Sequence, residues 1–304
     1  FFGSLLGFSA KESIYLGIMA AFSSTMVVVK LLADKREIDT LHGRIIIGIL
    51  LLQDLVAVFA LSFLTTMDGI TLPSIVLSLL KAAGIVAIAL FCSRFLFPAI
   101  FKFAAKSQEL LFLASLSTCF AFSIAFTFIG FPLAVGAFIA GVSIAALPYH
   151  VEIIARIRSL KDFFATLFFV SLGMGIVTKG LADLVVPLVV LTILVALLKP
   201  FIIMVLAALF GYAKRTSFLT AISLGQISEF SLIVASLGVS LGHVSGSFYT
   251  LIVLLAMVTI TLTAYCVKYD QKLTELLARP LAVFDLMRRG KHLQYEHQAG
   301  ESYD

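Results

Sequence analysis

The chain has 304 residues and a net charge of +5, and 61% of its residues are apolar while 13% are charged. With a mean hydropathy of +1.11, this composition excludes an ordinary soluble domain and predicts an all-α protein embedded in a lipid bilayer. The sequence holds no P-loop, no Gly-rich dinucleotide fingerprint, no zinc-type histidine spacing and no disulfide framework. We therefore expect neither a cofactor nor enzyme activity.

Apolar stretches follow one another along most of the chain, each near the roughly 18–20 residues that cross a bilayer. We expect about nine transmembrane helices from this pattern. Their approximate bounds are 12–33, 44–67, 72–97, 109–129, 131–148, 162–178, 182–212, 216–241 and 246–268. The fifth and sixth are short and contain glycine, so one of them could be re-entrant, although the charge pattern favours full crossings.

Lysine and arginine gather in alternate loops, which the positive-inside bias assigns to the cytoplasm. We therefore predict a multi-pass protein of the plasma membrane, with a transmembrane domain over 1–273 and a short cytoplasmic tail over 274–304. These basic loops also explain the isoelectric point near 9.1, so we infer no nucleic-acid partner. The third of these loops is expected around Arg156, Arg158 and Lys161.

Three hydroxyl residues lie together in the middle of the first span, in the run AAFSSTMVVVK: Ser23, Ser24 and Thr25. Hydroxyls can satisfy backbone groups freed by a broken helix, and such a break would expose carbonyls to a cation. Small residues are also common where membrane helices touch. The sequence leaves both interpretations open.

The second span carries Gln53 and Asp54 in the middle of an otherwise uncharged run, IIIGILLLQDLVAVFALSFLTT. A carboxylate at that depth costs roughly 2.5–3.5 kcal/mol on insertion scales, so it normally faces a water-filled cavity or a partner and handles protons or ions. Asp54 is therefore the first candidate for a transport residue.

Lys199 lies in the seventh span, far from both ends and directly before Pro200. A lone ammonium at that depth needs a partner. Pairing with Asp54 or Glu229 is the favoured interpretation, and the alternative is that the side chain extends along the helix toward the membrane surface.

The eighth span is interrupted by polar and small residues at a depth similar to that of the first. They are Gly225, Gln226, Ser228, Glu229 and Ser231. Broken helices at matching positions in two halves of a chain are typical of inverted-repeat transporters, which bind their substrate between the breaks at the membrane midplane. Here the repeat is suggested by polarity and not by sequence identity.

Four ordered segments resemble one family of transporters. The run FSSTMVVVKLLADKREIDTLHGRIIIGILLLQDLVAVFAL is similar to the central signature of monovalent cation:proton antiporters, in the Kef-like branch of the second cation:proton antiporter superfamily. Further along, PLAVGAFIAGVSIA, LKDFFATLFFVSLGMGI and SLGQISEFSLIVA resemble that family's later segments in the same order. The resemblance covers about 12 to 268.

The resemblance implies a core domain in which two broken helices cross near the membrane centre, beside a dimerisation domain, and elevator-like alternating access. It implies that Asp54 is the ion- and proton-binding carboxylate with Gln53 as its neighbour, and that Lys199 faces Asp54. It places two groups of residues at the broken helices: Ser23, Ser24 and Thr25 at the first, and Gln226, Ser228 and Glu229 at the second.

By the same resemblance, the chain represents about nine helices of a roughly thirteen-helix inverted-repeat protein, with N-terminal helices missing. The full protein is expected to be a homodimer. Gln53 before Asp54 is similar to Kef-like potassium transporters, so K+ is favoured as the cation and Na+ remains an alternative, with H+ as the other substrate. A single carboxylate suggests electroneutral exchange of one cation for one proton.

Two other functions stay open from the sequence. The same fold could form a gated potassium efflux pathway, which would conduct far faster than a carrier. It could also serve as a membrane sensor subunit that moves no ions.

Overall fold

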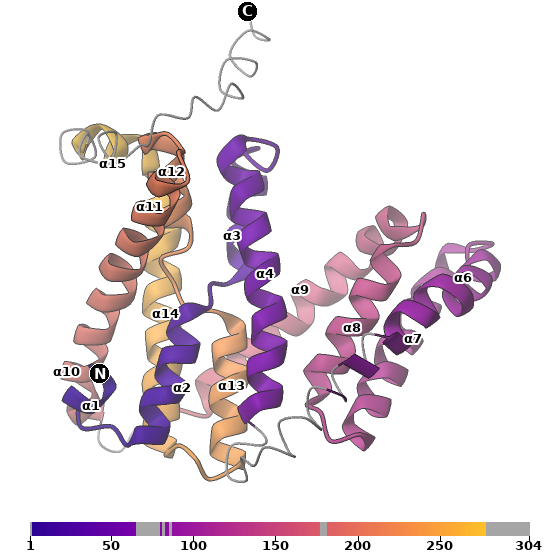
Figure 1. The fold of residues 1–304 in the computed structure, drawn as a ribbon, viewed down its shortest axis with the longest axis horizontal. Coiled ribbons are helices and arrows are strands. Elements are labelled where there is room, and N and C mark those ends of the chain that lie inside the picture. The colour runs from indigo at the N-terminus through magenta and orange to yellow at the C-terminus, as the bar shows by residue number, and fades with distance from the viewer. Residues whose placement is uncertain (1, 65–79, 81–82, 85–86, 177–180, 278–304) are drawn as a thin grey trace, which may run out of the picture. The chain divides into compact units, whose positions relative to one another are not determined.

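The fold was analysed in a computed structural model, which describes residues 2–64, 80, 83–84, 87–176 and 181–277. Over these ranges the chain is helical and contains no strand (Figure 1). Six described helices are long and apolar enough to cross a membrane. They are Ala10–Asp34, Leu41–Leu64, Ala87–Ala104, Gln108–Phe128, Leu181–Leu209 and Gly246–Lys268. The chain is therefore an all-α, multi-pass membrane protein.

The count of nine spans is not confirmed. Helix α8 (Leu133–Ala145) has 13 residues, which at 1.5 Å per residue is about 20 Å and shorter than a hydrocarbon core of about 30 Å. The eighth predicted span is two short helices, α12 (Lys214–Ser223) and α13 (Glu229–Ser240). Part of the third predicted span, 72–97, and most of the predicted tail, 274–304, lie outside the described residues.

The prediction of a basic loop before the sixth span is wrong. Helix α9 runs without a break over His150–Met174, so Arg156, Arg158 and Lys161 are helical. The segment contains no glycine or proline before Gly173, and arginine, lysine and leucine are good helix formers. Charge marked this segment as unfit for the membrane interior, but charge alone does not end a helix.

The described chain forms two compact units, one made of residues up to Leu55 and from Ile176 onward, the other of Val56–Gly175. Helix α4 (Leu41–Leu64) begins in the first unit and ends in the second. The remaining helices of the first unit are α1 (Phe2–Leu5), α2 (Ala10–Ala21), α3 (Thr25–Asp34), α10 (Leu181–Ile193), α11 (Lys199–Leu209), α12, α13, α14 (Gly246–Lys268) and α15 (Asp270–Leu276). Among them, α14 packs against α3, α10, α12, α13 and α15.

A buried cluster in the first unit joins α3, α4 and the segment after α12. Val28 and Leu32 of α3 pack with Ile46 and Leu50 of α4 and with Leu224. Each helix contributes side chains four residues apart, which lie on one face. Because lipid is as apolar as leucine, close packing rather than exclusion from water holds such a cluster together. The cluster fixes α3 beside the first half of α4.

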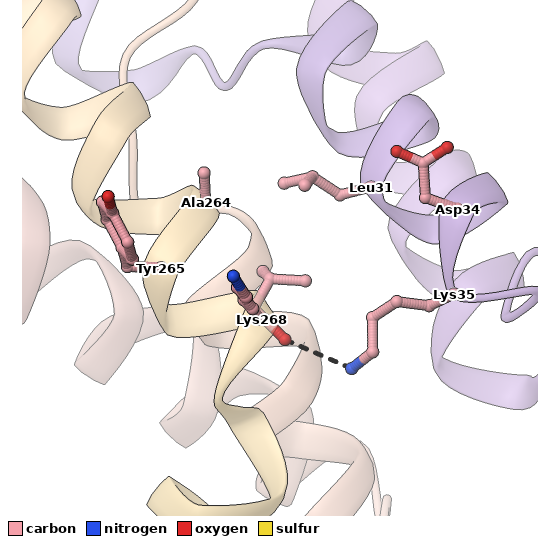
Figure 2. Close-up of a pocket in the computed structure, with 7 residues that line it drawn as sticks. Leu31, Asp34, Lys35, Ala264, Tyr265 and Lys268 are labelled. Carbon is pink, nitrogen blue, oxygen red and sulfur yellow. Dashed lines mark hydrogen bonds between the residues drawn. The ribbon is translucent and has the colours of Figure 1, made fainter.

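The C-terminal end of α3 is fastened to the end of α14 beside a cavity of about 390 Å³ (Figure 2). Lys35 forms an ion pair with Asp270, which is 5% exposed, and donates to the Val267 carbonyl at 3.2 Å. Asp270 also accepts from the backbone N–H of Gln271 at 2.7 Å, in the first turn of α15. Leu273 of α15 in turn packs against Ala208 and Phe218, so α15 links the end of α3 to α12.

The second unit contains α6 (Phe97–Ala104), α7 (Gln108–Phe128), α8 and α9. Helices α7 and α8 pack closely at Gly136, where an added Cβ would lie 2.6 Å from the Phe122 carbonyl oxygen. Aromatic rings fill much of the interior. They belong to Phe97, Phe101, Phe122, Phe126 and Phe131.

Candidate functional site

The first helix interruption lies between α2 and α3. Helix α2 ends at Ala21 and α3 begins at Thr25, with Phe22 (φ −84°, ψ 146°) and Ser24 (φ −72°, ψ 113°) in extended conformations. Ser24 caps α3, because its hydroxyl accepts from the Val27 N–H at 3.2 Å. Of the two interpretations that the sequence left open, the broken helix is the one the structure shows.

Gln53 of α4 closes the backbone of this interruption. Its carbonyl oxygen accepts from the Ser23 N–H at 3.0 Å, and its amide group donates to the Ala21 carbonyl at 3.2 Å. A helix end leaves such backbone groups without helical partners, and each buried orphan is costly. The Gln53 side chain therefore holds the broken backbone in place.

Asp54, the next residue of α4, faces the start of α3. The Thr25 hydroxyl lies 3.2 Å from Oδ1 and 3.0 Å from Oδ2 of the Asp54 carboxylate, so it donates to that group. Thr25 is the first residue of α3, and the positive end of a helix dipole favours an anion there. Both side chains are partly buried.

The second interruption covers residues 224–228, between α12 and α13. Ser228 caps α13 by accepting from the Phe230 N–H at 3.1 Å, while the Ser228 N–H donates to the Ser231 hydroxyl at 3.2 Å. Gly225 lies close to α11, since an added Cβ would sit 2.9 Å from Cγ of Pro200. A glycine at this position lets the interruption approach α11.

Three hydrogen bonds join the two interrupted helices directly. The Ser23 hydroxyl donates to the Leu224 carbonyl at 3.0 Å. The Ser231 hydroxyl donates to the Met19 carbonyl at 2.8 Å, and the Met26 N–H donates to Oε1 of Glu229 at 3.3 Å. Residues about 200 positions apart in the sequence thus form one polar region within the first unit.

Lys199 connects the interruptions through their carbonyl groups. It follows a π-helical turn over Leu194–Leu198 and begins α11. Its amine donates to the carbonyls of Phe22 and Gln226, each at 2.7 Å. These carbonyls lie just past the C-terminal ends of α2 and α12, where helix dipoles are negative and carbonyls lack partners.

The favoured sequence interpretation of Lys199, an ion pair with Asp54 or Glu229, is therefore not what the structure shows. Within the described residues no ion pair joins Lys199 to either carboxylate. The amine instead binds two backbone carbonyls that lack helical partners. Every residue has a backbone carbonyl, so the sequence could not identify these two as the partners.

All nine predicted site residues lie at or beside the two interruptions. Gln53, Asp54 and Thr25 gather at the first, Ser24 and Ser228 cap the following helices, and the others bridge the two. Sequence reasoning missed the backbone groups of Phe22, Leu224 and Met26. It also missed Thr259 of α14, whose hydroxyl lies 3.4 Å from the Ile227 N–H. A threonine inside an apolar helix was the available signal.

A cavity of about 490 Å³ reaches the first interruption from the side of α2 and α10–α11. Its lining is largely aliphatic, with Gln53, Lys199 and Ser13 as the polar exceptions. No cluster of three or more His, Cys, Asp or Glu side chains suited to a metal ion occurs in the part of the chain that the structure describes. The site therefore has the chemistry of hydroxyls, amides, carbonyls and single carboxylates.

Comparison with known proteins identifies the family. The chain matches the model of the sodium/hydrogen exchanger transmembrane family over residues 1–268. The chain belongs to this family. It is 30% identical over 258 residues to K(+) efflux antiporter 6 of Arabidopsis thaliana, which is 82% of this chain and 43% of that protein.

Two bacterial family members are also similar. The Na(+)/H(+)-K(+) antiporter GerN of Bacillus cereus is 26% identical over 274 residues, covering 88% of this chain and 70% of GerN. The glutathione-regulated potassium-efflux system protein KefC of Escherichia coli is 27% identical over 239 residues, covering 77% and 38%. The predicted kinship with Kef-like antiporters is thus confirmed. The chain spans less than half of the length of the plant relative.

Proposed function

We propose that this chain forms the exchange site of a secondary antiporter that exchanges a monovalent cation for protons, with Asp54 alternately binding a proton and the cation. The observation that carries the proposal is the surroundings of Asp54. Its carboxylate lies within an apolar helix, receives the Thr25 hydroxyl, and has no cationic partner among the described ion pairs. A carboxylate so placed is free to take a proton or a cation.

Coupling follows from the cost of moving charge through lipid. An empty, ionised Asp54 would carry an uncompensated charge across a dry region, which is expensive. Binding of either a proton or a monovalent cation lowers that negative charge. The loaded site therefore crosses more readily than the empty site, which is the requirement for exchange. In this proposal the two interruptions cross at the membrane midplane in an inverted repeat, and the site moves by alternating access.

The cation is K+ by preference, with Na+ as the alternative. Two similar proteins are named for potassium efflux and GerN is named for both ions. Gln53 leaves Asp54 as the sole carboxylate at this level of α4, and its amide is engaged by Ala21 and Ser23. The hydroxyl and carboxylate oxygens of Thr25 and Asp54 are ligands of a kind that suits either ion.

We further propose that the protein lies in the plasma membrane as a homodimer, with its C-terminal end in the cytoplasm. The alternation of basic segments supports this orientation, apart from the segment that proved to be helical in α9.

Proton flux in proteoliposomes tests the proposal. A pH gradient is set, KCl or NaCl is added outside, and a pH-sensitive dye reports the lumen. We expect cation-dependent dissipation that saturates, and its loss in Asp54→Asn, which keeps the shape of the side chain but cannot exchange a proton. Asp34→Asn, at the exposed end of α3, is the matched control and should behave as wild type. Equal flux in Asp54→Asn and wild type would refute the proposal, whereas conductance far above carrier rates would indicate a gated pathway.

A further inference from the structure

Asp54 and Glu229 approach the same helix end from two different helices. Thr25 donates to Asp54 through its hydroxyl, and the next residue, Met26, donates to Oε1 of Glu229 through its backbone N–H at 3.3 Å. Thr25 and Met26 are consecutive residues in the first turn of α3. Two carboxyl groups, one from α4 and one from α13, thus meet one helix N-terminus.

Glu229 is poorly satisfied as an anion. Its second oxygen, Oε2, is buried and accepts no hydrogen bond from any described residue. Nearby in the chain, Gln226 is fully buried, and its side-chain oxygen and nitrogen likewise lack partners among the described residues. A buried carboxylate without donors costs far more than a neutral carboxyl group.

Within the residues that the structure describes, no ion pair joins Glu229 to a cation. The Lys199 amine bonds the carbonyl of Gln226, three residues before Glu229, and that of Phe22, and donates to neither oxygen of Glu229 in the described contacts. The N-terminal ends of α3 and α13 supply only about half an elementary charge each. The remaining charge on an ionised Glu229 would face the site that Asp54 shares.

Helix α13 packs against α2 and α14, and none of the described hydrogen bonds or ion pairs joins a titratable side chain of these helices to Glu229. On α2 these side chains are Lys11, Glu12 and Tyr15, and on or after α13 and α14 they are His243, Tyr249, Tyr265, Cys266 and Lys268. Tyr15 and His243 bond each other at 2.9 Å beyond the C-terminal end of α13. Glu12 binds Ser245 at the start of α14.

We propose that Glu229 is a second proton-binding carboxylate of the exchange site, and that it loses its proton together with Asp54 when the cation enters. The inference rests on the proposed function and deepens it. In the exchange, one cation enters as two protons leave, so the two O–H bonds break without oxidation and the site gains one net negative charge. Exchange is then voltage-dependent, in contrast with the one-for-one exchange expected from a single carboxylate.

Counting protons released on cation binding tests this directly. The purified full chain is held in detergent with weak buffer and a pH dye, and KCl, NaCl or choline chloride is added. Wild type is expected to release about two protons per chain at saturation with the effective cation, and Glu229→Gln about one. Glu229→Gln keeps the oxygen that accepts from Met26, so the fold at α3 is retained. Glu275→Gln, an exposed change on α15, should match wild type.

The outcomes separate this inference from the function beneath it. Equal proton release by wild type and Glu229→Gln overturns the role of Glu229 while leaving antiport at Asp54 intact. No cation-specific release from wild type overturns both. As a second readout, an imposed membrane potential should change the flux of wild-type proteoliposomes and leave that of Glu229→Gln nearly unchanged. If the wild-type flux ignores the potential, the second proton is not transported and the inference fails.

Discussion

Ser23 and Leu224 are 201 positions apart and are joined by a hydrogen bond of 3.0 Å from the serine hydroxyl to the leucine carbonyl. Each residue lies in a segment where a helix has stopped. The bond therefore satisfies a carbonyl that its own helix leaves without a partner, using a side chain from the other interrupted helix. In a membrane, water cannot replace a lost hydrogen-bond partner, so losing this contact would leave the carbonyl unpaired and destabilise the fold.

Ser23→Ala should lower the stability of the protein by about 1–3 kcal/mol, the cost of leaving a buried carbonyl unpaired. The measurement is the midpoint of thermal unfolding, followed with a thiol-reactive dye that reports the partly buried Cys92, Cys119 and Cys266. Ser240→Ala is the matched control, since that exposed hydroxyl donates to the Leu237 carbonyl within its own helix end. Equal midpoints for the two variants would contradict the structural role of Ser23.

Gln53→Leu should destabilise the first interruption, because the Ser23 N–H and the Ala21 carbonyl both lose their partner. We expect a loss of about 1–3 kcal/mol for the N–H of the buried Ser23 and less for the carbonyl of the exposed Ala21, seen as a lower unfolding midpoint, together with reduced cation-dependent flux. Gln271→Leu on the exposed side of α15 is the control. A Gln53→Leu protein of unchanged stability would mean that the backbone of the interruption does not depend on this side chain.

Thr25→Val should weaken cation binding while leaving the fold in place, since valine has the shape of threonine without its hydroxyl. Loss of one hydrogen bond to a charged group, about 1.5–3 kcal/mol, corresponds to an apparent affinity about ten- to a hundred-fold weaker. Flux as a function of KCl and NaCl concentration gives the value. Thr25→Ser keeps the hydroxyl and should stay near wild type, and a serine variant as impaired as the valine variant would show that the hydroxyl is not what matters.

Lys199→Met should separate the two interruptions, because the carbonyls of Phe22 and Gln226 both lose their donor. We expect one of the largest stability losses of any single change in this unit, several kcal/mol by summing about 1–3 for each carbonyl. Thermal unfolding measures it. Lys102→Met, an exposed change on α6, is the comparison, and a similar midpoint for both would show that the ammonium does not hold the interruptions.

The Lys35 to Asp270 ion pair predicts a rescue by exchange of charges. Lys35→Asp and Asp270→Lys should each lower the unfolding midpoint, because each leaves like charges facing one another at a mostly buried position. The double variant should recover part of the loss, since breaking a buried pair typically costs about 3–5 kcal/mol and restoring opposite charges returns some of it. If the double variant lost as much stability as the two single variants together, the ion pair would not contribute to stability.

Sequence patterns predicted much of the fold's class and the location of the site for identifiable reasons. Long apolar stretches indicate membrane helices. Polar residues are costly at membrane depth, so Ser23, Asp54, Lys199 and Gln226 could each be identified as candidates for the site. The two interruptions were visible because hydroxyls and glycine cluster where backbone groups lose helical partners.

Other features could not be read from the sequence because backbone atoms make them. The partners of Lys199 are carbonyls of Phe22 and Gln226, and any residue type can supply a carbonyl. The extent of α9 was misjudged because Arg156, Arg158 and Lys161 are both good helix formers and poor membrane residues, so charge and helix propensity gave opposite indications. The role of Gln53 also needed coordinates, since only they reveal that its amide meets Ala21 and Ser23.

The shared attachment of Lys199 has a mechanical consequence. The Lys199 amine donates to one carbonyl from each interrupted helix. A shift of one interruption relative to the other would therefore stretch or break one of these hydrogen bonds. The two interruptions are expected to move together rather than independently. Under the proposed alternating access, a displacement of one interruption is therefore expected to carry the other with it.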